Sequence, residues 1–517
     1  MRARRESLLR SPRAAGAAAL AVALGLVAWA AVTRARFLFA SPYPLGIDGY
    51  FYPIQLRALL AGGHLYYPSS PLVLWLMAPL AAVTDPITGA KLGAALGTAA
   101  VALPVYAVGR RVSGDRAIGV LAAVLAATSA SSFYLSVEFV KSGVGMTFAA
   151  VYLAFLGRAV ERPTRARIAA AALSLVAALA AHKLAGALAL LSTPAPIFVA
   201  WRARGGRLSF ADRRVRVALV AAGLAAASLV AAGLLAPTRF PGLRDVALLG
   251  DLFAASPDFT IPALDLGRGP ALRFGLEAPI AGALALAAVG LLIAGRRWPA
   301  LAGDLPARER ALVVGPAAFA LLATCPWLDA ADPQGLAFRL RVVLFVPLAV
   351  CAAFVAGRAL ARSTPLVRGA LVIGFAAGWI VSRPPTSSEG MVTEQPHMVA
   401  AMMAARGVVP DGDVVVCPQR SLVFMYTWYT GRPARTRPEP VPHDHRWRLL
   451  PSRLIHRELH AALDRMRAER PPGLTLPRGL HPRHRNGVVL VPEASWDWLM
   501  AHVSPPVRAI YQRWQTI

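Results

Sequence analysis

The fold of this protein is decided by residues 91–157, which read KLGAALGTAAVALPVYAVGRRVSGDRAIGVLAAVLAATSASSFYLSVEFVKSGVGMTFAAVYLAFLG. Three apolar runs cover 91–108, 117–135 and 143–157. Runs of this kind form helices that cross a hydrocarbon core of roughly 30 Å. The first connection, RRVSGDR (110–116), is basic, whereas the second, SVEFVKSG (136–143), carries one acid and one base. The stretch therefore predicts membrane-spanning helices whose connections alternate in charge.

The rest of the chain repeats this pattern. Of 517 residues, 56% are hydrophobic and only 16% are charged, a composition typical of a multi-pass membrane protein. Because lipid offers no water to backbone groups and the runs show no alternation, they are predicted to be helices. We predict about eleven spans, near 14–32, 91–108, 117–135, 143–157, 168–181, 184–200, 217–236, 278–294, 311–326, 342–356 and 366–381.

Arginine bias in the short loops sets the orientation. If the N-terminus is cytoplasmic and the first span is retained, every inner connection is basic: 110–116, 158–167, 201–216, 295–310 and 357–368. The apolar segment 71–83 is short for a span, so we place it against the outer face. The long loop 33–90 and residues 382–517 then lie outside. The expected location is a bacterial cytoplasmic (inner) membrane, with the C-terminal part in the periplasm.

Residues 382–517 differ in character from the rest of the chain. Strands are predicted at GDVVVCP (412–418), LVFMYTWY (422–429) and GVVLVP (487–492), and a helix at 452–470. A connection rich in Pro, Arg and His (432–448) and a basic turn (477–486) separate them. The fold class is therefore an all-α polytopic membrane domain (1–381) followed by a soluble, periplasmic α/β domain (382–517).

Charge and cysteine content exclude two other classes. The net charge of +28 is spread over short loops and the C-terminal part. A nucleic-acid-binding protein concentrates its charge in one stripe, so no nucleic-acid partner is expected. Cys325, Cys351 and Cys417 are scattered and indicate neither a disulfide framework nor a metal set.

The outer connections carry the residues that chemistry needs. Asp48 lies in LGIDGYFYPIQLRALLAGGHLYYPSSP (45–71), soon after the first span. Apolar surroundings suit a carboxylate to act as a general base, although an Asp there can also cap a helix beginning near Tyr50. Glu138 and Lys141 share the second outer turn. The two residues can form an ordinary surface ion pair. Alternatively, Glu138 is a second acid beside Asp48 and can share a divalent cation with it.

Two further outer turns carry cations. His182 and Lys183 lie between two spans, where a lysine can also simply reach the interface. Arg339 and Arg341 lie at the start of the tenth span. They can bind a phosphate or can serve as interfacial anchors. Ionisable residues gathered at one membrane depth indicate a site, and two acids with several cations suit chemistry on an amphiphile that carries phosphate. Candidates for acceptor or sugar binding are Tyr50, Tyr52, Arg57, His64 and His182.

This arrangement resembles the GT-C superfamily of integral-membrane glycosyltransferases, which includes the aminoarabinose transferases of lipid A, the protein mannosyltransferases and the oligosaccharyltransferase catalytic subunit. Asp48, with the run GGHLYYPSSP that follows it, matches the first essential acid of that family. Glu138 matches the second acid, and FRLR (338–341) matches the arginine that faces the lipid-linked phosphate. The chain departs from the family where SWDW (495–498) only superficially echoes the WWD motif and where no Asp-Glu pair follows Asp48. Both departures make a protein acceptor less favoured.

The resemblance implies an inverting transferase (EC 2.4 class) that moves a sugar from a polyprenyl-phosphate-linked lipid donor to a hydroxyl of a cell-envelope glycan, lipid or protein. Asp48 would be the base, and Arg339, Arg341, Lys183 and Lys141 would bind the donor phosphate. Glu138 would position the acceptor or, with Asp48, hold a divalent metal such as Mg or Mn. The main rival functions are a transporter or lipid flippase, which would bury charges at the midplane of repeated broken helices, and a non-catalytic scaffold.

Overall fold

The computed structural model describes residues 12–203, 205, 252–253, 274–297, 305–328, 335–381, 396–417, 419–436, 441–451, 455–480 and 488–516. The chain divides into two compact units. The first comprises 1–37, 67–79 and 91–387, and the second comprises 38–66, 80–90 and 388–517. The first loop, which sequence reasoning groups with the membrane domain, is thus divided between the units.

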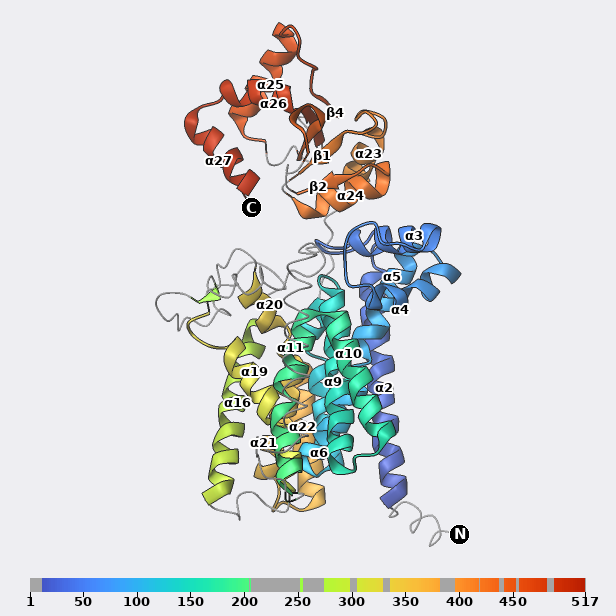
Figure 1. Cartoon of the computed structure of the whole chain (residues 1–517), viewed down its shortest axis with the longest axis vertical. Helices are drawn as coiled ribbons and strands as arrows, with labels where there is room; N and C mark the ends of the chain where they lie inside the picture. The colour runs from blue at the N-terminus through green and yellow to red at the C-terminus, as the bar shows by residue number, and fades with distance from the viewer. Residues whose placement is uncertain are drawn as a thin grey trace, which may run out of the picture. The chain divides into compact units, whose positions relative to one another are not determined.

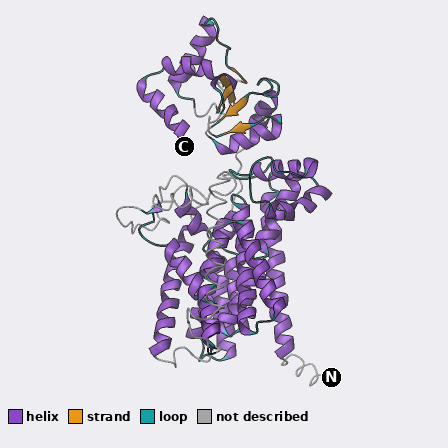
Figure 2. Cartoon of the chain, viewed as in Figure 1, coloured by secondary structure: helices purple, strands orange, loops and turns teal. Residues whose placement is uncertain are grey.

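The first unit is a helical bundle (Figures 1 and 2). Its helices are α2 (Pro12–Leu38), α4 (Leu72–Val83), α5 (Pro86–Ala99), α6 (Ala102–Ser113), α7 (Arg116–Ala127), α8 (Ala130–Leu135), α9 (Val140–Glu161), α10 (Arg165–Ala181), α11 (Lys183–Leu191), α12 (Pro194–Ala203), α16 (Phe274–Arg297), α18 (Ala307–Ala311), α19 (Val314–Ala323), α20 (Leu336–Val342), α21 (Phe345–Ala359) and α22 (Pro365–Val381). Helix α9 packs along α10 and α11, and α21 packs against α6, α7, α16 and α19. The last residues of α4, from Leu80, and the first residues of α5, up to Ala90, belong to the second unit.

The described residues include five helices long and apolar enough to cross a membrane, or six if the bent pair α20 and α21 forms one span. They match the spans predicted at 14–32, 91–108, 143–157, 184–200, 278–294 and 342–356. The runs at 117–135, 168–181, 311–326 and 366–381 fall on shorter helices, and the predicted span 217–236 lies outside the described residues. The run 117–135 is broken because Ser129 caps a new helix, α8, through a hydrogen bond from the Ser132 N–H.

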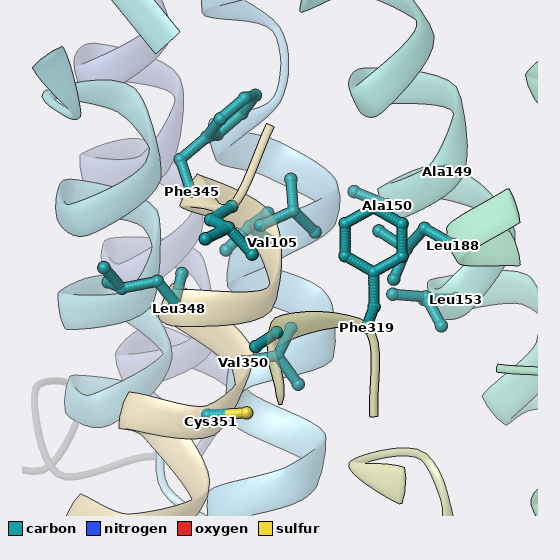
Figure 3. Packing of buried hydrophobic residues seen from close by; sticks show 14 of the residues in the cluster. Val105, Ala149, Ala150, Leu153, Leu188, Phe319, Phe345, Leu348, Val350 and Cys351 are labelled. Atoms are coloured by element: carbon teal, nitrogen blue, oxygen red, sulfur yellow. The ribbon is translucent and has the colours of Figure 1, made fainter. Parts of the chain in front are cut away.

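Small side chains let the helices of the bundle approach closely. Phe319 of α19 points toward Ala150, Leu153 and Leu188 of the neighbouring helices (Figure 3). Lipid tails are as apolar as a helix surface, so close van der Waals packing rather than apolar burial holds such helices together. The alanine-rich composition is therefore a packing requirement of the bundle.

The second unit contains a five-stranded sheet of order β2-β1-β3-β5-β4, drawn in orange in Figure 2. Its strands are β1 (Val414–Val416), β2 (Ala434–Arg435), β3 (Arg446–Pro451), β4 (Arg478–Leu480) and β5 (Val488–Pro492). β1 runs parallel to β2 and β3, and β5 runs antiparallel to β3 and β4. Its helices are α3 (Phe51–Gly62), α23 (Pro396–Ala404), α24 (Arg420–Thr430), η4 (His443–His445), α25 (Arg457–Glu469), α26 (Glu493–Ala501) and α27 (Pro505–Thr516).

Three predictions in this unit are wrong. The segment 477–486, predicted as a basic turn, contains strand β4 at its start. The segment 422–429, predicted as a strand, lies inside helix α24, which ends at Gly431 in the left-handed conformation. Its residues are buried almost without interruption, and a continuous apolar run does not distinguish a helix from a buried strand. The segment 432–448, predicted as a connection, contains β2 and most of the sequence leading into β3. The predicted strands at 412–418 and 487–492 and the helix at 452–470 are present as β1, β5 and α25.

Candidate active site

Cations from three separate turns gather in the first unit. Lys141 is the second residue of α9, His182 and Lys183 form the turn between α10 and α11, and Arg339 lies in α20. Lys141, Arg339 and Lys183 all act electrostatically on the His182 ring. We call these four residues the cation cluster. The structure thus brings together four residues that sequence reasoning took from three different turns.

His182 is the neutral centre of the cation cluster. Its Nδ1 accepts a hydrogen bond from the Leu184 N–H at 3.3 Å and so caps α11, while its Nε2 lies 3.2 Å from Ser142 Oγ. Since Nδ1 accepts, the ring proton resides on Nε2, which donates to Ser142. Burial, together with the charges of Lys141, Arg339 and Lys183, lowers the pKa of His182 to about 3. The ring therefore adds no charge of its own near neutral pH.

Glycine on α9 makes room for this turn. A Cβ placed on Gly145 would lie 3.0 Å from the Cβ of His182 and 3.1 Å from that of Ala185. Such contacts are tighter than ordinary van der Waals packing, so any larger residue at 145 would displace the start of α11. Gly145 thus sets the position of His182 relative to Ser142.

The two flanking cations are each held by a specific neighbour. Lys141 Nζ donates to Ser69 Oγ at 2.5 Å, which ties α9 to the segment before α4. The Arg339 guanidinium lies over the Phe139 ring, 5.2 Å from its centroid, and Phe139 in turn packs edge-on against Tyr134. An arginine whose plane is fixed on an aromatic ring keeps its N–H groups oriented for a phosphate.

Glu138 and Arg341 are close in the sequence to members of the cation cluster, Lys141 and Arg339. Glu138 is buried in the turn before α9, where its backbone N–H donates to the Tyr134 carbonyl. Arg341 follows Arg339 by two residues on α20, and positions two apart do not share a helix face. Of the two arginines, Arg339 is the one whose charge acts on His182.

Asp48 belongs to the second unit, where its partner is an arginine that sequence reasoning missed. The Asp48 Oδ1 lies 3.2 Å from Nε of Arg420, the first residue of α24. The Asp48 side chain is 12% exposed and that of Arg420 48% exposed. The N-cap of α3 is Tyr50, so Asp48 does not occupy the capping position that the alternative interpretation assigned to it.

The predicted acceptor residues of the first loop separate into two groups. The Tyr50 hydroxyl lies 2.6 Å from that of Tyr429, and Arg57 donates to the Trp428 carbonyl at 3.2 Å and covers its ring at 4.3 Å. Both residues therefore contact the last turn of α24, whereas Arg420 is the first residue of that helix. Tyr52 is buried with its ring against Phe51. His64 is exposed beyond the far end of α3 and does not join this group.

Two buried charges of the first unit were also missed. Glu277 accepts hydrogen bonds from Ser129 Oγ at 2.5 Å and from the Ala130 and Ser131 N–H groups, and so caps α8. Arg34, 1% exposed, donates to the Ala127 carbonyl and to Ser132 Oγ. Both residues could have been found from the sequence, because each lies at the end of an apolar run, where burying an ionisable side chain costs free energy.

The described residues contain no group of three or more His, Cys, Asp or Glu side chains that could hold a metal ion. Asp48 and Glu138, the two candidate ligands, belong to different units.

The apolar helices identify a membrane protein with a helical bundle. No protein-family model and no curated protein matches the chain. The chain is similar to two solved structures of ArnT from Cupriavidus metallidurans, one bound to undecaprenyl phosphate and one in the apo state, each at 14% identity with a TM-score of 0.48. The alignments cover 94% and 92% of this chain and 99% of each ArnT chain.

Proposed function

We propose that this protein is a GT-C glycosyltransferase that moves a sugar from a polyprenyl-phosphate-linked donor to an acceptor hydroxyl. The observation that supports this best is the cation cluster, in which Lys141, Lys183 and Arg339 surround a neutral His182. Cationic side chains gathered at the end of a helical bundle suit a phosphate carried by a membrane lipid.

In this mechanism the acceptor oxygen attacks the anomeric carbon while the bond from that carbon to the phosphate oxygen breaks. The lipid phosphate leaves with the electron pair, and the configuration inverts. Negative charge therefore grows on the phosphate, and fixed cations stabilise it by a few kcal/mol. Arg339 would bind the phosphate through its planar guanidinium, and Lys141 and Lys183 would each contribute a positive charge. The His182 Nε2–H is directed at Ser142.

The acceptor proton passes to Asp48 in this proposal. Its carboxylate forms an ion pair with Arg420 through Oδ1, which favours the ionised form that a base needs. Tyr50 and Arg57 would bind the acceptor, and Glu138 would position it. That Asp48 and Glu138 face one cavity stays a prediction of this mechanism.

We place the reaction on the periplasmic face of the cytoplasmic membrane, because the cation cluster lies at the end of α9 opposite the basic connection 158–167. Reporter fusions after Arg297 and Pro410 test the assignment. The first should read cytoplasmic and the second periplasmic. A cytoplasmic signal at Pro410 contradicts this placement.

The donor site is tested with undecaprenyl phosphate as the probe and undecaprenol, which lacks the phosphate, as its matched control. Arg339→Gln should weaken binding of the phosphate by about tenfold or more, since a charged hydrogen bond contributes roughly 1.5–3 kcal/mol. Arg339→Lys should restore part of it. Arg36→Gln is the control variant, because Arg36 is an exposed arginine near the end of α2. It should bind undecaprenyl phosphate as the wild type does.

Equal affinity for the phosphate and the alcohol would overturn the donor assignment. The activity itself is tested by mass spectrometry of envelope glycans from a deletion strain, in which one sugar modification should disappear. An unchanged glycan profile would favour the transporter or flippase alternative.

A further inference from the structure

A second polar cavity lies at the other end of the same helices. It has a volume of about 700 Å³ and is formed by the last turns of α6 and α9, the first turn of α10 and the segment 305–309. Lys141 and Arg158 are separated by 17 residues of α9, which corresponds to about 25 Å along the helix. The cavity is therefore separate from the cation cluster.

The charges lining this cavity do not balance. Four arginines and two glutamates line it: Arg110, Arg111, Arg158, Arg167, Glu161 and Glu309. Arg111 is bound to both acids, through an ion pair with Glu161 and through its Nε, which lies 2.8 Å from Glu309 Oε2. Both carboxylates are thus already engaged by one arginine.

The other three arginines form no ion pair with any residue that the structure describes. Arg110 and Arg158 are exposed and lie near the rings of Tyr106 and Phe155. The Arg167 guanidinium donates to the Arg158 carbonyl at 3.4 Å. Their guanidinium groups keep N–H donors that no carboxylate of the described chain takes up. Arginine forks match the oxygens of a phosphate group.

The wall of the cavity is also partly apolar, with Phe155 and Leu305 among its lining residues. A cavity of this volume, with a few charged groups on apolar walls, is of the size that holds a small ligand. Basic pockets between membrane helices on the cytoplasmic side bind the headgroups of anionic lipids. Loop charge places this end of the bundle on that side.

We propose that this arginine-lined cavity binds the phosphate group of an anionic phospholipid from the leaflet at that end of the bundle. The inference goes beyond glycosyl transfer and does not rest on it. Arg110, Arg158 and Arg167 bind the phosphate oxygens, and Arg111 stays with its two glutamates. Phe155 and Leu305 contact the apolar part of the lipid.

The test is native mass spectrometry of the full-length protein titrated with phosphatidylglycerol, with diacylglycerol, which lacks the phosphate, as the control lipid. The double variant Arg158→Gln/Arg167→Gln should lose affinity for phosphatidylglycerol by about thirtyfold, or roughly fivefold for each arginine. Arg165→Gln is the matched control, because Arg165 is exposed on the same turn of α10 and does not line the cavity. It should bind as the wild type does.

A third arm adds inorganic phosphate to the lipid-bound protein. No displacement at millimolar phosphate supports a lipid headgroup as the source of the phosphate, whereas full displacement overturns the lipid assignment in favour of free phosphate. The proposal is also overturned if the double variant retains wild-type affinity, or if Arg165→Gln loses as much. Binding of undecaprenyl phosphate at the cation cluster should be unchanged in the double variant, which separates this result from that of the proposed function.

Discussion

Asp48 and Arg420 are 372 residues apart in the chain, and their side chains form an ion pair with 3.2 Å between Oδ1 and Nε. Arg420 also lies over the ring of Phe424, one turn further along α24, at 5.4 Å from its centroid. Phe51, just after Asp48, packs against the same Phe424 ring. The first loop and α24 are thus joined, around the residue proposed as the base, by one charged contact and one aromatic contact.

The first prediction is that Asp48→Asn abolishes glycosyl transfer while the protein stays folded. The amide keeps the shape of the carboxylate but does not take the acceptor proton, and loss of a general base costs about 100-fold or more in rate. The ion pair with the half-exposed Arg420 contributes at most about 1 kcal/mol, so the melting temperature should change little. Transfer assays and thermal unfolding measure the two effects.

Asp464→Asn is the control for this variant, because Asp464 is an exposed acid on α25 of the same unit. It should change neither transfer nor stability. If Asp48→Asn instead melts well below the wild type and transfers normally per folded molecule, Asp48 has a structural role.

The second prediction concerns the partner of the base. Arg420→Gln removes the cation that favours the ionised form of Asp48, so the carboxyl should take up a proton at higher pH. The acid limb of the rate profile should then move to higher pH, by an amount limited by solvent screening of the half-exposed Arg420. Activity above that limb should be nearly that of the wild type.

Rates between pH 4.5 and 8.5 test this shift. Arg406→Gln, an exposed arginine of the same unit, should leave the profile in place. An unchanged acid limb in Arg420→Gln would show that the ionisation of Asp48 does not control the rate.

How far the sequence predicts this structure depends on the range of the contacts. Short turns between apolar runs placed His182 and Lys183 at the end of two helices, and the structure brings them to Lys141 and Arg339. The pairing of Asp48 with Arg420 follows no periodicity, because periodicity reports only neighbours on one element. Helix α24 was mistaken for a strand, and that error also hid Arg420 as the first residue of a helix.

The tautomer of His182 also lay beyond sequence reasoning. It depends on two hydrogen bonds, from the Leu184 N–H and to Ser142, which exist only once α11 begins at Lys183 and packs on α9. Similarly, Glu277 acts as a cap for α8 from a helix that begins almost 150 residues later. Both roles follow from tertiary packing rather than from local pattern.

The third prediction tests that packing. Gly145→Ala places a Cβ 3.0 Å from the Cβ of His182, so the start of α11 must shift by a few tenths of an ångström. The Ser142–His182 contact should weaken, and donor affinity and transfer should fall several-fold through displaced Lys183. Affinity for undecaprenyl phosphate and the transfer rate measure the effect.

Gly290→Ala is the matched control, since a Cβ on Gly290 of α16 would meet no atom within 4 Å. That variant should be neutral or slightly more stable, because alanine favours a helix over glycine by roughly 1 kcal/mol. Equal behaviour of the two variants would remove Gly145 from the set of positioning residues.

The last prediction is an acid sensitivity of definite sign at His182. In the folded protein its pKa is about 3, against an ordinary value of 6.5. Below about pH 6.5 the unfolded chain therefore binds a proton that the folded chain does not, and the free energy of unfolding decreases as the pH falls toward 3. At pH 5 this decrease amounts to about 2 kcal/mol.

Melting temperatures of the detergent-solubilised protein at pH 7.5 and pH 5 measure this effect. His182→Gln should melt lower than the wild type at pH 7.5, because glutamine replaces the cap of α11 imperfectly, but it should lose fewer degrees on acidification. His502→Gln, an exposed histidine, should show the full wild-type decrease. Undecaprenyl phosphate should reduce the decrease in the wild type, since its negative charge offsets Lys141, Lys183 and Arg339 and raises the pKa of His182. An identical decrease in His182→Gln and the wild type would show that His182 is not held neutral in the fold.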